Sequence, residues 1–299
     1  MNDEYPVFLG LEAEPPAWKD AAAVILPLPY ERTVSWGEGT ENGPRALLEA
    51  SEYIELYDEE LECEPHRHGF YTAPPVIAAA EDPATALDEI EDEVRRHMAA
   101  GKFVVSVGGE HGVTLAPARA AADVFGLDLG IVQFDAHADL RDTYHGTPYS
   151  HASVMRRVVD DVGLSLLPVG LRAITSEEAA LIRDRDIPTI WSHEVHADAL
   201  SGSTARFEDL LQQLPDQVYL TFDIDFFDPS LIPATGTPEP GGGFWHPTMA
   251  LLRTLFREKT VVAMDVVELA PIAGQPASDF VAAKLIYKCL GYLFDDGPG

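Results

Sequence analysis

Cysteine is scarce in this 299-residue chain, which contains only Cys63 and Cys289. Two cysteines without metal-ligand spacing provide neither a disulfide framework nor a thiolate metal site. Cys289 lies within an apolar helical pattern. We therefore predict two free thiols in a reducing compartment.

Positive charge is also scarce. The chain has 20 Lys and Arg against 50 Asp and Glu, which gives a formal net charge of −30. Such a chain repels nucleic acid and anionic membrane surfaces, so neither is expected as a partner. The acidic excess predicts adaptation to high salt, where screening relieves self-repulsion. Because the charge is spread over the whole length, it does not by itself identify a cationic substrate.

Long apolar runs are absent. No run is long enough to span a bilayer, and the N-terminus MNDEYPVFLG lacks a basic region followed by an apolar core. No linker, repeat or low-complexity tract divides the chain. We expect a single domain over residues 1–299, soluble and cytoplasmic.

A short apolar run at residues 129–134 is followed by Asp135, His137 and Asp139. The run is too short for most helices and predicts a buried strand. Side chains of an extended chain alternate with period two, so these three side chains are expected to leave one face together. Two carboxylates and one imidazole would then converge just beyond a strand end.

Two further apolar runs end in the same residue types. The run 217–222 leads into Asp223 and Asp225, and the run 103–107 leads to His111. An acidic pair after one strand has an ordinary alternative as a helix N-cap or solvated turn. Burying six ionisable groups at adjacent strand ends without a cation would be very costly, however. Four carboxylates with two imidazoles and no sulfur favour a site for two hard divalent cations.

Strand and helix patterns alternate about eight times along the chain. This alternation predicts an α/β fold, a single-domain three-layer α/β/α arrangement with a central, mainly parallel sheet of about eight strands. Ligands of such sheets gather at the carboxyl ends of strands. The expected strands are residues 21–27, 75–79, 103–107, 129–134, 166–171, 189–191, 217–222 and 261–267, and the expected helices cover 43–50, 84–100, 115–124, 153–159, 176–183, 205–214, 246–258 and 280–294.

Segments around these residues resemble the ureohydrolases, the arginase and agmatinase family, and most of all its agmatinase branch. They fall in the family's order with similar spacing, and an N-terminal segment, SWGEGTENGPRALLEAS (35–51), is also similar. The other segments are GGEHGVT (108–114), FDAHADLRD (134–142), YSHASVMRR (149–157), TFDIDFFDP (221–229), TGTPEPGG (235–242) and DVVELAP (265–271).

The resemblance implies an arginase-like fold and a hydrolase with two Mn²⁺ per chain that releases urea from a guanidinium group. Asp135 and Asp223 would bridge the two ions, which together lower the pKa of a shared water. Ligand type alone leaves iron, cobalt and zinc open. The implied ligands are His111, Asp135, Asp139 and Asp223 for one ion, and Asp135, His137, Asp223 and Asp225 for the other.

The resemblance also implies two catalytic residues. His151 matches the family's proton-shuttling histidine, and Glu268 matches the acid that pairs with the substrate guanidinium. Taken alone, His151 could equally be a helix cap and Glu268 a surface residue. Glu110 and Asp228 are expected to support the ligands by hydrogen bonds. The remaining loop histidines, His145, His193, His196 and His246, are expected to be exposed and without function.

The expected substrate is agmatine, a small cationic guanidino compound, hydrolysed to putrescine and urea. Arginases carry an Asp after a Gly-Leu-Arg segment to contact the α-amino group, whereas Arg172 is followed here by Ala173. The loop 140–150 also lacks the Asn and Ser pattern that arginases use for the α-carboxylate. Aminopropylagmatine or another guanidino compound fits the same chemistry, and arginine is disfavoured. The family resemblance further implies a homo-oligomer of three or six chains.

Two other classes stay open. A two-metal phosphatase would use a similar ligand set, but the basic residues near the motifs are only Arg141, Arg156 and Arg157. A non-catalytic metal-stabilised relative would keep the ligands and lose the shuttle and the substrate acid, and this chain has both.

Overall fold

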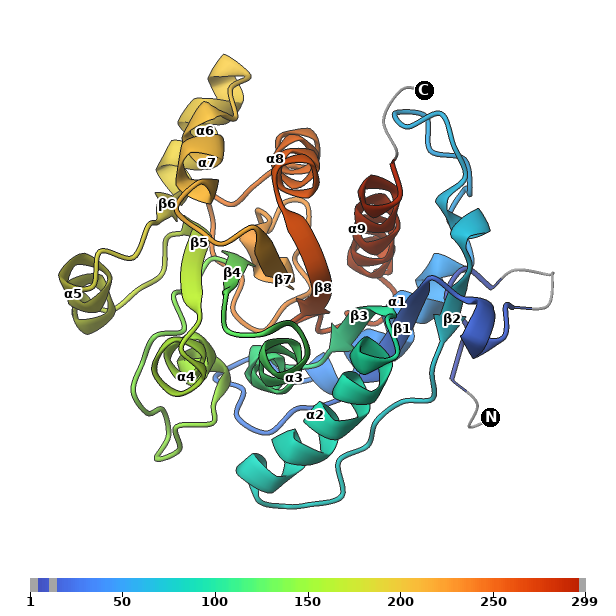
Figure 1. The fold of residues 1–299 in the computed structure, drawn as a ribbon. Helices are drawn as coiled ribbons and strands as arrows, with labels where there is room; N and C mark the ends of the chain where they lie inside the picture. The colour runs from blue at the N-terminus through green and yellow to red at the C-terminus, as the bar shows by residue number, and fades with distance from the viewer. Residues whose placement is uncertain (1–4, 11–14, 296–299) are drawn as a thin grey trace.

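The computed structural model describes residues 5–10 and 15–295 (Figure 1). Over these residues the chain forms one sheet of eight strands in the order β2-β1-β3-β8-β7-β4-β5-β6, and every neighbouring pair is parallel. The fold class predicted from the sequence is confirmed. The strands are β1 Ala23–Leu28, β2 Phe70–Thr72, β3 Phe103–Gly108, β4 Leu129–Phe134, β5 Ser165–Leu171, β6 Ile190–Trp191, β7 Gln217–Asp223 and β8 Thr260–Val267.

Helices cover both faces of the sheet. Figure 1 shows α2, α3 and α4 on one side and α8 and α9 on the other. The helices are α1 Gly43–Ser51, α2 Pro83–Ala99, α3 Leu115–Phe125, α4 Val154–Arg157, α5 Ser176–Asp184, α6 Ser192–Ser201, α7 Ala205–Leu211, α8 Trp245–Glu258 and α9 Ala277–Leu293. Among the described residues, no helix is long and apolar enough to cross a membrane.

The period-two alternation of the strands separates two hydrophobic cores. In β4, Leu129 and Ile131 pack with residues of α2, α3 and α4, whereas Val132 and Phe134 pack with residues of α7, α8 and α9. All four side chains are fully buried. A strand covered on both faces is therefore apolar at nearly every position, which is why these runs could be recognised in the sequence.

Two sequence predictions about elements are wrong. Residues 75–79 do not form a strand, and the strand beside β1 is instead the three-residue β2. Pro74 and Pro75 lack backbone N–H donors, so the ladder is interrupted there, although Val76 N–H still donates to Pro27 O at 3.0 Å. Helix α6 was not predicted, because only Ser192 and Val195 are buried in it and its apolar periodicity is weak.

The sheet order brings four strand ends together. Strands β3, β8, β7 and β4 are neighbours, and because they are parallel their carboxyl ends lie along one edge. The segments that follow these four strands carry all the predicted site residues except His151. The division of the chain into a single domain stays a prediction, although one sheet contains strands from β1 to β8.

Candidate metal centre and active site

The six predicted ligands meet at this edge of the sheet. Asp135 directly follows β4, Asp223 is the last residue of β7, and His111 opens a short 3₁₀ helix after β3. All of them except His137 are buried, with at most 6% of each residue exposed. The structure thus brings together the side chains that the sequence analysis selected.

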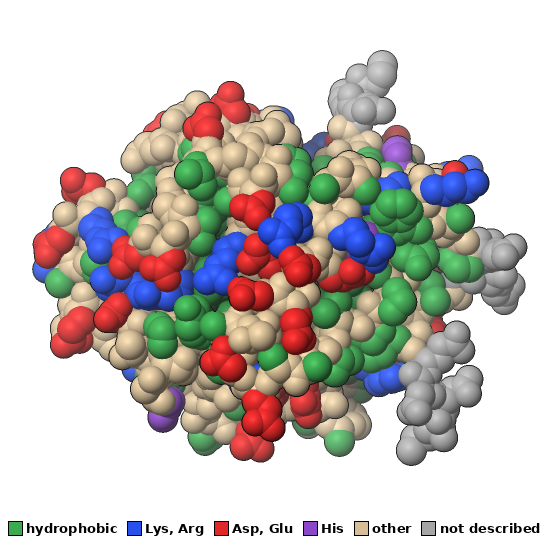
Figure 2. Space-filling model, turned by 60° about the horizontal axis from the view of Figure 1, so that its bottom comes forward, with side chains coloured by type: hydrophobic (Ala, Val, Ile, Leu, Met, Phe, Trp, Pro, Cys, Tyr) green, Lys and Arg blue, Asp and Glu red, His purple; other side chains and the backbone are tan. Residues whose placement is uncertain are grey.

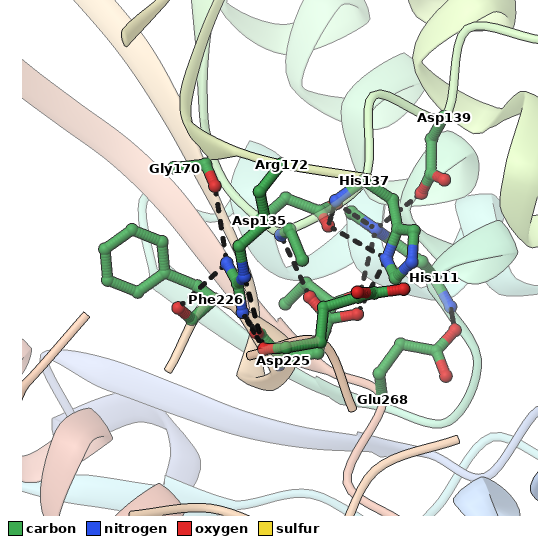
Figure 3. A network of polar contacts seen from close by, with 12 residues as sticks. His111, Asp135, His137, Asp139, Gly170, Arg172, Asp225, Phe226 and Glu268 are labelled. Carbon is green, nitrogen blue, oxygen red and sulfur yellow. Dashed lines mark hydrogen bonds and ion pairs between the residues drawn. The ribbon is translucent and has the colours of Figure 1, made fainter. Parts of the chain in front are cut away.

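The ligand atoms form two groups that share one carboxylate. The first contains His111, Asp135 and Asp223, the second contains Asp135, His137 and Asp225, and the ligand atoms of each group lie within 4.8 Å of one another. Figure 3 shows His111, Asp135, His137 and Asp225 of these groups pointing toward one another. Asp135 Oδ2 lies 3.1 Å from His111 Nδ1, and Asp135 Oδ1 lies 3.7 Å from His137 Nδ1. Asp135 is therefore placed to bridge two cations.

The remaining contacts complete each group. His111 Nδ1 lies 2.9 Å from Asp139 Oδ2 and 3.4 Å from Asp223 Oδ2. His137 Nδ1 lies 2.8 Å from Asp225 Oδ2. These distances group Asp139 with His111, as the family resemblance implies.

The two acidic motifs use the same local turn. The main-chain N–H of His137 donates to Asp135 Oδ1 at 2.6 Å, and that of Asp225 donates to Asp223 Oδ1 at 2.8 Å. A carboxylate that accepts from the amide two residues on is an Asx turn. The turn curls each segment, so that residues i and i+2 both face the centre.

The expectation of an extended segment through Asp139 is wrong. Asp139 has a φ of +52°, in the left-handed region, and the chain reverses there. Its carboxylate still lies 2.9 Å from His111 Nδ1. The predicted residue is present at the site, but for a different geometric reason.

Buried hydrogen bonds fix the imidazole of His111. Its Nε2 lies 2.9 Å from Thr221 Oγ1, and that hydroxyl donates its only proton to Asp265 Oδ1 at 2.7 Å. His111 Nε2 must therefore carry the hydrogen, which leaves Nδ1 as the atom with a free lone pair. His111 Nδ1 is buried and has no hydrogen-bond partner among the described residues. A histidine whose far nitrogen is held in this way is typical of a metal ligand.

The electrostatics of the centre call for cations. Burial, followed by the neighbouring Asp135 carboxylate, raises the pKa of Asp139 to about 7, and burial next to Asp225 and Asp135 raises the pKa of Asp223 well above its usual range. Burial alone would lower the pKa of His137, but Asp225 and Asp135 raise it to about 12. Four crowded carboxylates are what two divalent cations would balance, so the residues fit a two-metal site.

A pocket of about 240 Å³ opens above the centre. His151 and Glu268 both line it, together with the metal-centre residues Asp139, Asp223 and Asp225. One wall comes from the N-terminal segment 34–37, where Gly37 N–H donates to Gly236 O at 3.2 Å. A Cβ at Gly37 would lie 2.8 Å from Gly236 O, so only glycine permits this approach.

Glu268 lies at the base of the pocket. Its Oε1 accepts from the main-chain N–H of His111 at 2.5 Å, and Oε2 faces Gly236. Burial raises the pKa of Glu268 to about 8, although the His111 amide opposes the shift. The residue adopts a φ of +65°, which turns the chain immediately after β8. A positively charged group in the pocket would restore its ionised form.

His151 contacts the N-terminal segment through both ring nitrogens. Nε2 lies 2.8 Å from Ser35 Oγ, and Nδ1 lies 3.1 Å from Thr33 Oγ1. Burial, followed by the charges of His111 and His137, lowers the pKa of His151 to about 4. The sequence analysis missed Ser35 and Thr33 because short polar residues in a loop carry no local signal of function.

Arg172 holds the segment that carries Asp225. Its guanidinium donates to main-chain carbonyls at the end of β5 and in the segment after β7. Figure 3 shows the contacts with Gly170, Asp225 and Phe226. Such a planar fork can bind several carbonyls at once. The acceptors are the carbonyl oxygens of Gly170 (3.3 Å), Asp225 (2.6 Å), Phe226 (3.4 Å), Phe227 (3.4 Å) and Glu239 (2.8 Å).

The roles predicted for Glu110 and Asp228 are wrong. Among the described hydrogen bonds, neither carboxylate contacts a metal-centre side chain. Glu110 accepts from the amides of Arg32 and Thr33, both at 2.6 Å. Asp228 accepts from Ser230 and from the Gly241 amide at 2.8 Å, so it closes a surface loop.

The other histidines lie away from the centre. His145, His193 and His246 are exposed, whereas His196 is half-buried and its Nε2 contacts Gly241 O at 2.9 Å. None of the four belongs to a potential metal-ligand group in the described part of the chain.

Comparison with known proteins agrees with this geometry. A model of the Arginase family matches residues 21–291. The chain is 43% identical to the N(1)-aminopropylagmatine ureohydrolase of Synechocystis sp. over 92% of this chain and 90% of that protein. It is 33% identical to the agmatinase of Pyrococcus horikoshii, over 91% and 92% of the two chains.

A solved structure extends the agreement to the fold. The agmatine ureohydrolase of Thermoplasma volcanium superimposes with a TM-score of 0.84 at 26% identity, covering 94% of this chain and 92% of that one. The residues that the family model matches include all strands of the sheet. The two ligand groups that share Asp135 lie beneath the pocket, as a two-metal hydrolase requires. The chain belongs to the arginase family and is a ureohydrolase.

Proposed function

We propose that this enzyme hydrolyses the terminal guanidino group of a linear guanidino amine, N1-aminopropylagmatine or agmatine, to urea and the corresponding amine. The observation that carries the proposal is the pair of ligand groups sharing Asp135, directly beneath a pocket lined by Glu268 and His151. Two Mn²⁺ ions would be held by His111, Asp135, Asp139 and Asp223, and by Asp135, His137, Asp223 and Asp225. When bound, such ions supply a water molecule activated for attack near neutral pH.

The residues of the chain itself would bind the substrate and move a proton. The Glu268 carboxylate, with Oε1 held by the His111 amide, offers Oε2 to the guanidinium. His151, reaching the pocket beside Ser35, would protonate the departing amine. Ala173 lines the pocket where arginases place an aspartate for the α-amino group, and this supports a substrate without an amino-acid head.

Relatives favour the longer substrate. Several of the similar proteins, at 32–43% identity, are named N(1)-aminopropylagmatine ureohydrolase, and others are named agmatinase. The pocket opens beside Trp36 and Tyr144, whose rings can contact the ammonium groups of an extended amine. We therefore place N1-aminopropylagmatine first and agmatine, which would give putrescine, second.

The test is urea release from Mn²⁺-loaded protein in high-salt buffer with N1-aminopropylagmatine, agmatine and arginine side by side. We expect metal-dependent urea from at least one of the first two, a larger kcat/KM for N1-aminopropylagmatine, and none after chelation. Glu268→Gln keeps the shape of the side chain and should raise KM and lower kcat. No urea from any substrate, with two metals bound per chain, would reject the proposal.

A further inference from the structure

Glu110 is a fully buried carboxylate that the reaction described above does not use. Both of its oxygens are hydrogen-bonded. Oε2 accepts the amides of Arg32 and Thr33, both at 2.6 Å, and Oε1 accepts the Thr33 hydroxyl at 2.7 Å. The ionised form of Glu110 accepts all three of these donors at once. Glu110 therefore fixes both the position and the hydroxyl proton of Thr33.

Thr33 in turn contacts His151 twice. Its Oγ1 accepts the main-chain N–H of His151 at 3.1 Å and lies 3.1 Å from Nδ1 of the same residue. A threonine hydroxyl has one proton, and here that proton is directed to Glu110. The contact with Nδ1 is therefore a hydrogen bond only if Nδ1 carries the hydrogen and donates it to Thr33.

The other side of the ring completes the assignment. With the hydrogen on Nδ1 of the neutral imidazole, Nε2 carries the lone pair and accepts from Ser35 Oγ, 2.8 Å away. Ser35 lines the pocket and also lies 3.2 Å from the Tyr144 hydroxyl; since the one proton of Ser35 goes to Nε2 in this arrangement, Tyr144 is the donor in that contact. Of the two neutral tautomers of His151, only the Nδ1–H form allows both ring nitrogens to form hydrogen bonds, one with Thr33 and one with Ser35.

We propose that Thr33 is a positioning residue for His151. The Thr33 hydroxyl, held by Glu110, accepts a hydrogen bond from Nδ1–H of His151. Nε2 is then the nitrogen that exchanges protons on the pocket side. The proposal rests on the proposed function, in which His151 protonates the leaving amine. In each cycle Nε2 would take a proton from water and pass it to the amine nitrogen, while the hydrogen on Nδ1 stays there and remains hydrogen-bonded to Thr33 Oγ1.

The direct test is the tautomer of His151. Protein labelled with ¹⁵N-histidine and loaded with Zn²⁺, which is diamagnetic, is examined by long-range ¹H–¹⁵N correlation spectra, and His151→Asn identifies the signals of His151. We expect the Nδ1–H tautomer in the unaltered protein. A predominant Nε2–H tautomer would overturn the proposal, and this measurement requires neither a Thr33 variant nor a known substrate.

Substitution provides the second test. Thr33→Val keeps the branched shape and removes the hydroxyl, so it should shift His151 toward the Nε2–H tautomer and lower kcat by about 10- to 100-fold with KM changed less than about twofold. Thr33→Ser restores the hydroxyl and should recover both the tautomer and most of kcat. An unchanged tautomer in Thr33→Val would contradict the proposal. Failure of all substrates to yield urea would reject the proposed function without affecting the tautomer result.

Discussion

At the scale of the residue, Asp135 belongs to both ligand groups, so its substitution is expected to affect metal binding more than substitution of a ligand that belongs to one group. Its two oxygens face different histidines, whereas His137 contacts only the second group. A substitution at Asp135 would therefore act on both proposed cations, and one at His137 on a single one.

We predict that Asp135→Asn lowers the bound manganese from two ions toward none, whereas His137→Asn retains about one. Urea release should fall by at least about 10³-fold in Asp135→Asn, because the activated water is lost with the ions. Metal content is measured by mass spectrometry after gel filtration. Asp142→Asn is the matched control, since Asp142 lies on the same segment but is exposed and paired with Arg157. Two ions in Asp135→Asn would refute the bridging role.

The protonation of His137 predicts how metal binding depends on pH. Without a cation, its pKa of about 12 in the folded protein exceeds the ordinary 6.5. A raised pKa stabilises the metal-free fold fully below pH 6.5, and this contribution is lost progressively as the pH rises toward 12. Metal binding needs a neutral imidazole, so uptake releases protons and strengthens with pH.

Accordingly, the increase in melting temperature on adding Mn²⁺ should be larger at pH 8.5 than at pH 6. Differential scanning calorimetry of chelated and Mn²⁺-loaded samples measures this increase in melting temperature. Titration of the metal-free protein with Mn²⁺ in weak buffer should lower the pH, because binding releases protons. An increase that does not change with pH would argue against imidazolium in the metal-free centre. His137→Asn should reduce the pH dependence.

At the scale of the element, Arg172 joins the end of β5 to the segment after β7. Its guanidinium donates to the carbonyls of Asp225, Phe226 and Phe227, of which Phe226 O also accepts the Gly243 amide at 2.9 Å, and it thereby holds the segment after the Asp223 turn. Arg172→Met would remove the guanidinium donor from the carbonyls of Asp225 and Phe227, at about 1–3 kcal/mol for each group that water cannot reach.

We expect Arg172→Met to lower the free energy of unfolding by about 2–4 kcal/mol and to weaken binding at the site that contains Asp225. Arg172→Lys should recover little, because an ammonium cannot reproduce the planar fork. Urea denaturation with metal present and absent measures both effects. Arg141→Met is the comparison, since Arg141 lines the pocket itself and its guanidinium lies over the ring of Tyr144 instead of binding these carbonyls. Equal losses in the two variants would show that the network has no special role.

Elements were predictable where strands are buried on both faces. The runs at 103–107, 129–134 and 217–222 are apolar because helices cover both sides, and the carboxyl-end rule then placed His111, Asp135 and Asp223 at one edge. The role of these residues as metal ligands stays a prediction. The positive φ of Asp139 and Glu268, the contact of Thr33 with His151 and the carbonyls bound by Arg172 arise from tertiary contacts. Nothing in the neighbouring sequence encodes such contacts, so they could not be predicted.

At the scale of the whole molecule, the acidic surface is only partly neutralised. Figure 2 shows Arg and Lys side chains among Asp and Glu on one face. The single side chain of Arg95 contacts three carboxylates, those of Glu91, Asp92 and Asp123. With 50 acidic and 20 basic residues, the chain keeps a formal net charge of −30. Repulsion between the carboxylates destabilises the compact state at low ionic strength.

The melting temperature should therefore rise between 0.1 and 2 M KCl, by roughly 5 °C, which corresponds to about 3 kcal/mol for a chain of this size. Calorimetry of the metal-loaded protein measures it. Sucrose at matched osmolality is the control, because it stabilises proteins without screening charge. A melting temperature that falls or stays constant with KCl would contradict adaptation to salt.

The position of β8 has a consequence for biosynthesis. This strand comes last in the chain but lies between β3 and β7, in the middle of the sheet. A nascent polypeptide that ends after α8 therefore contains the strands of two partial sheets. The edge strands β3 and β7 then lack β8, the strand that pairs with both of them. Because Glu268 follows β8, the active site cannot be complete before β8 has been synthesised, and a product truncated before β8 should be inactive and prone to aggregate.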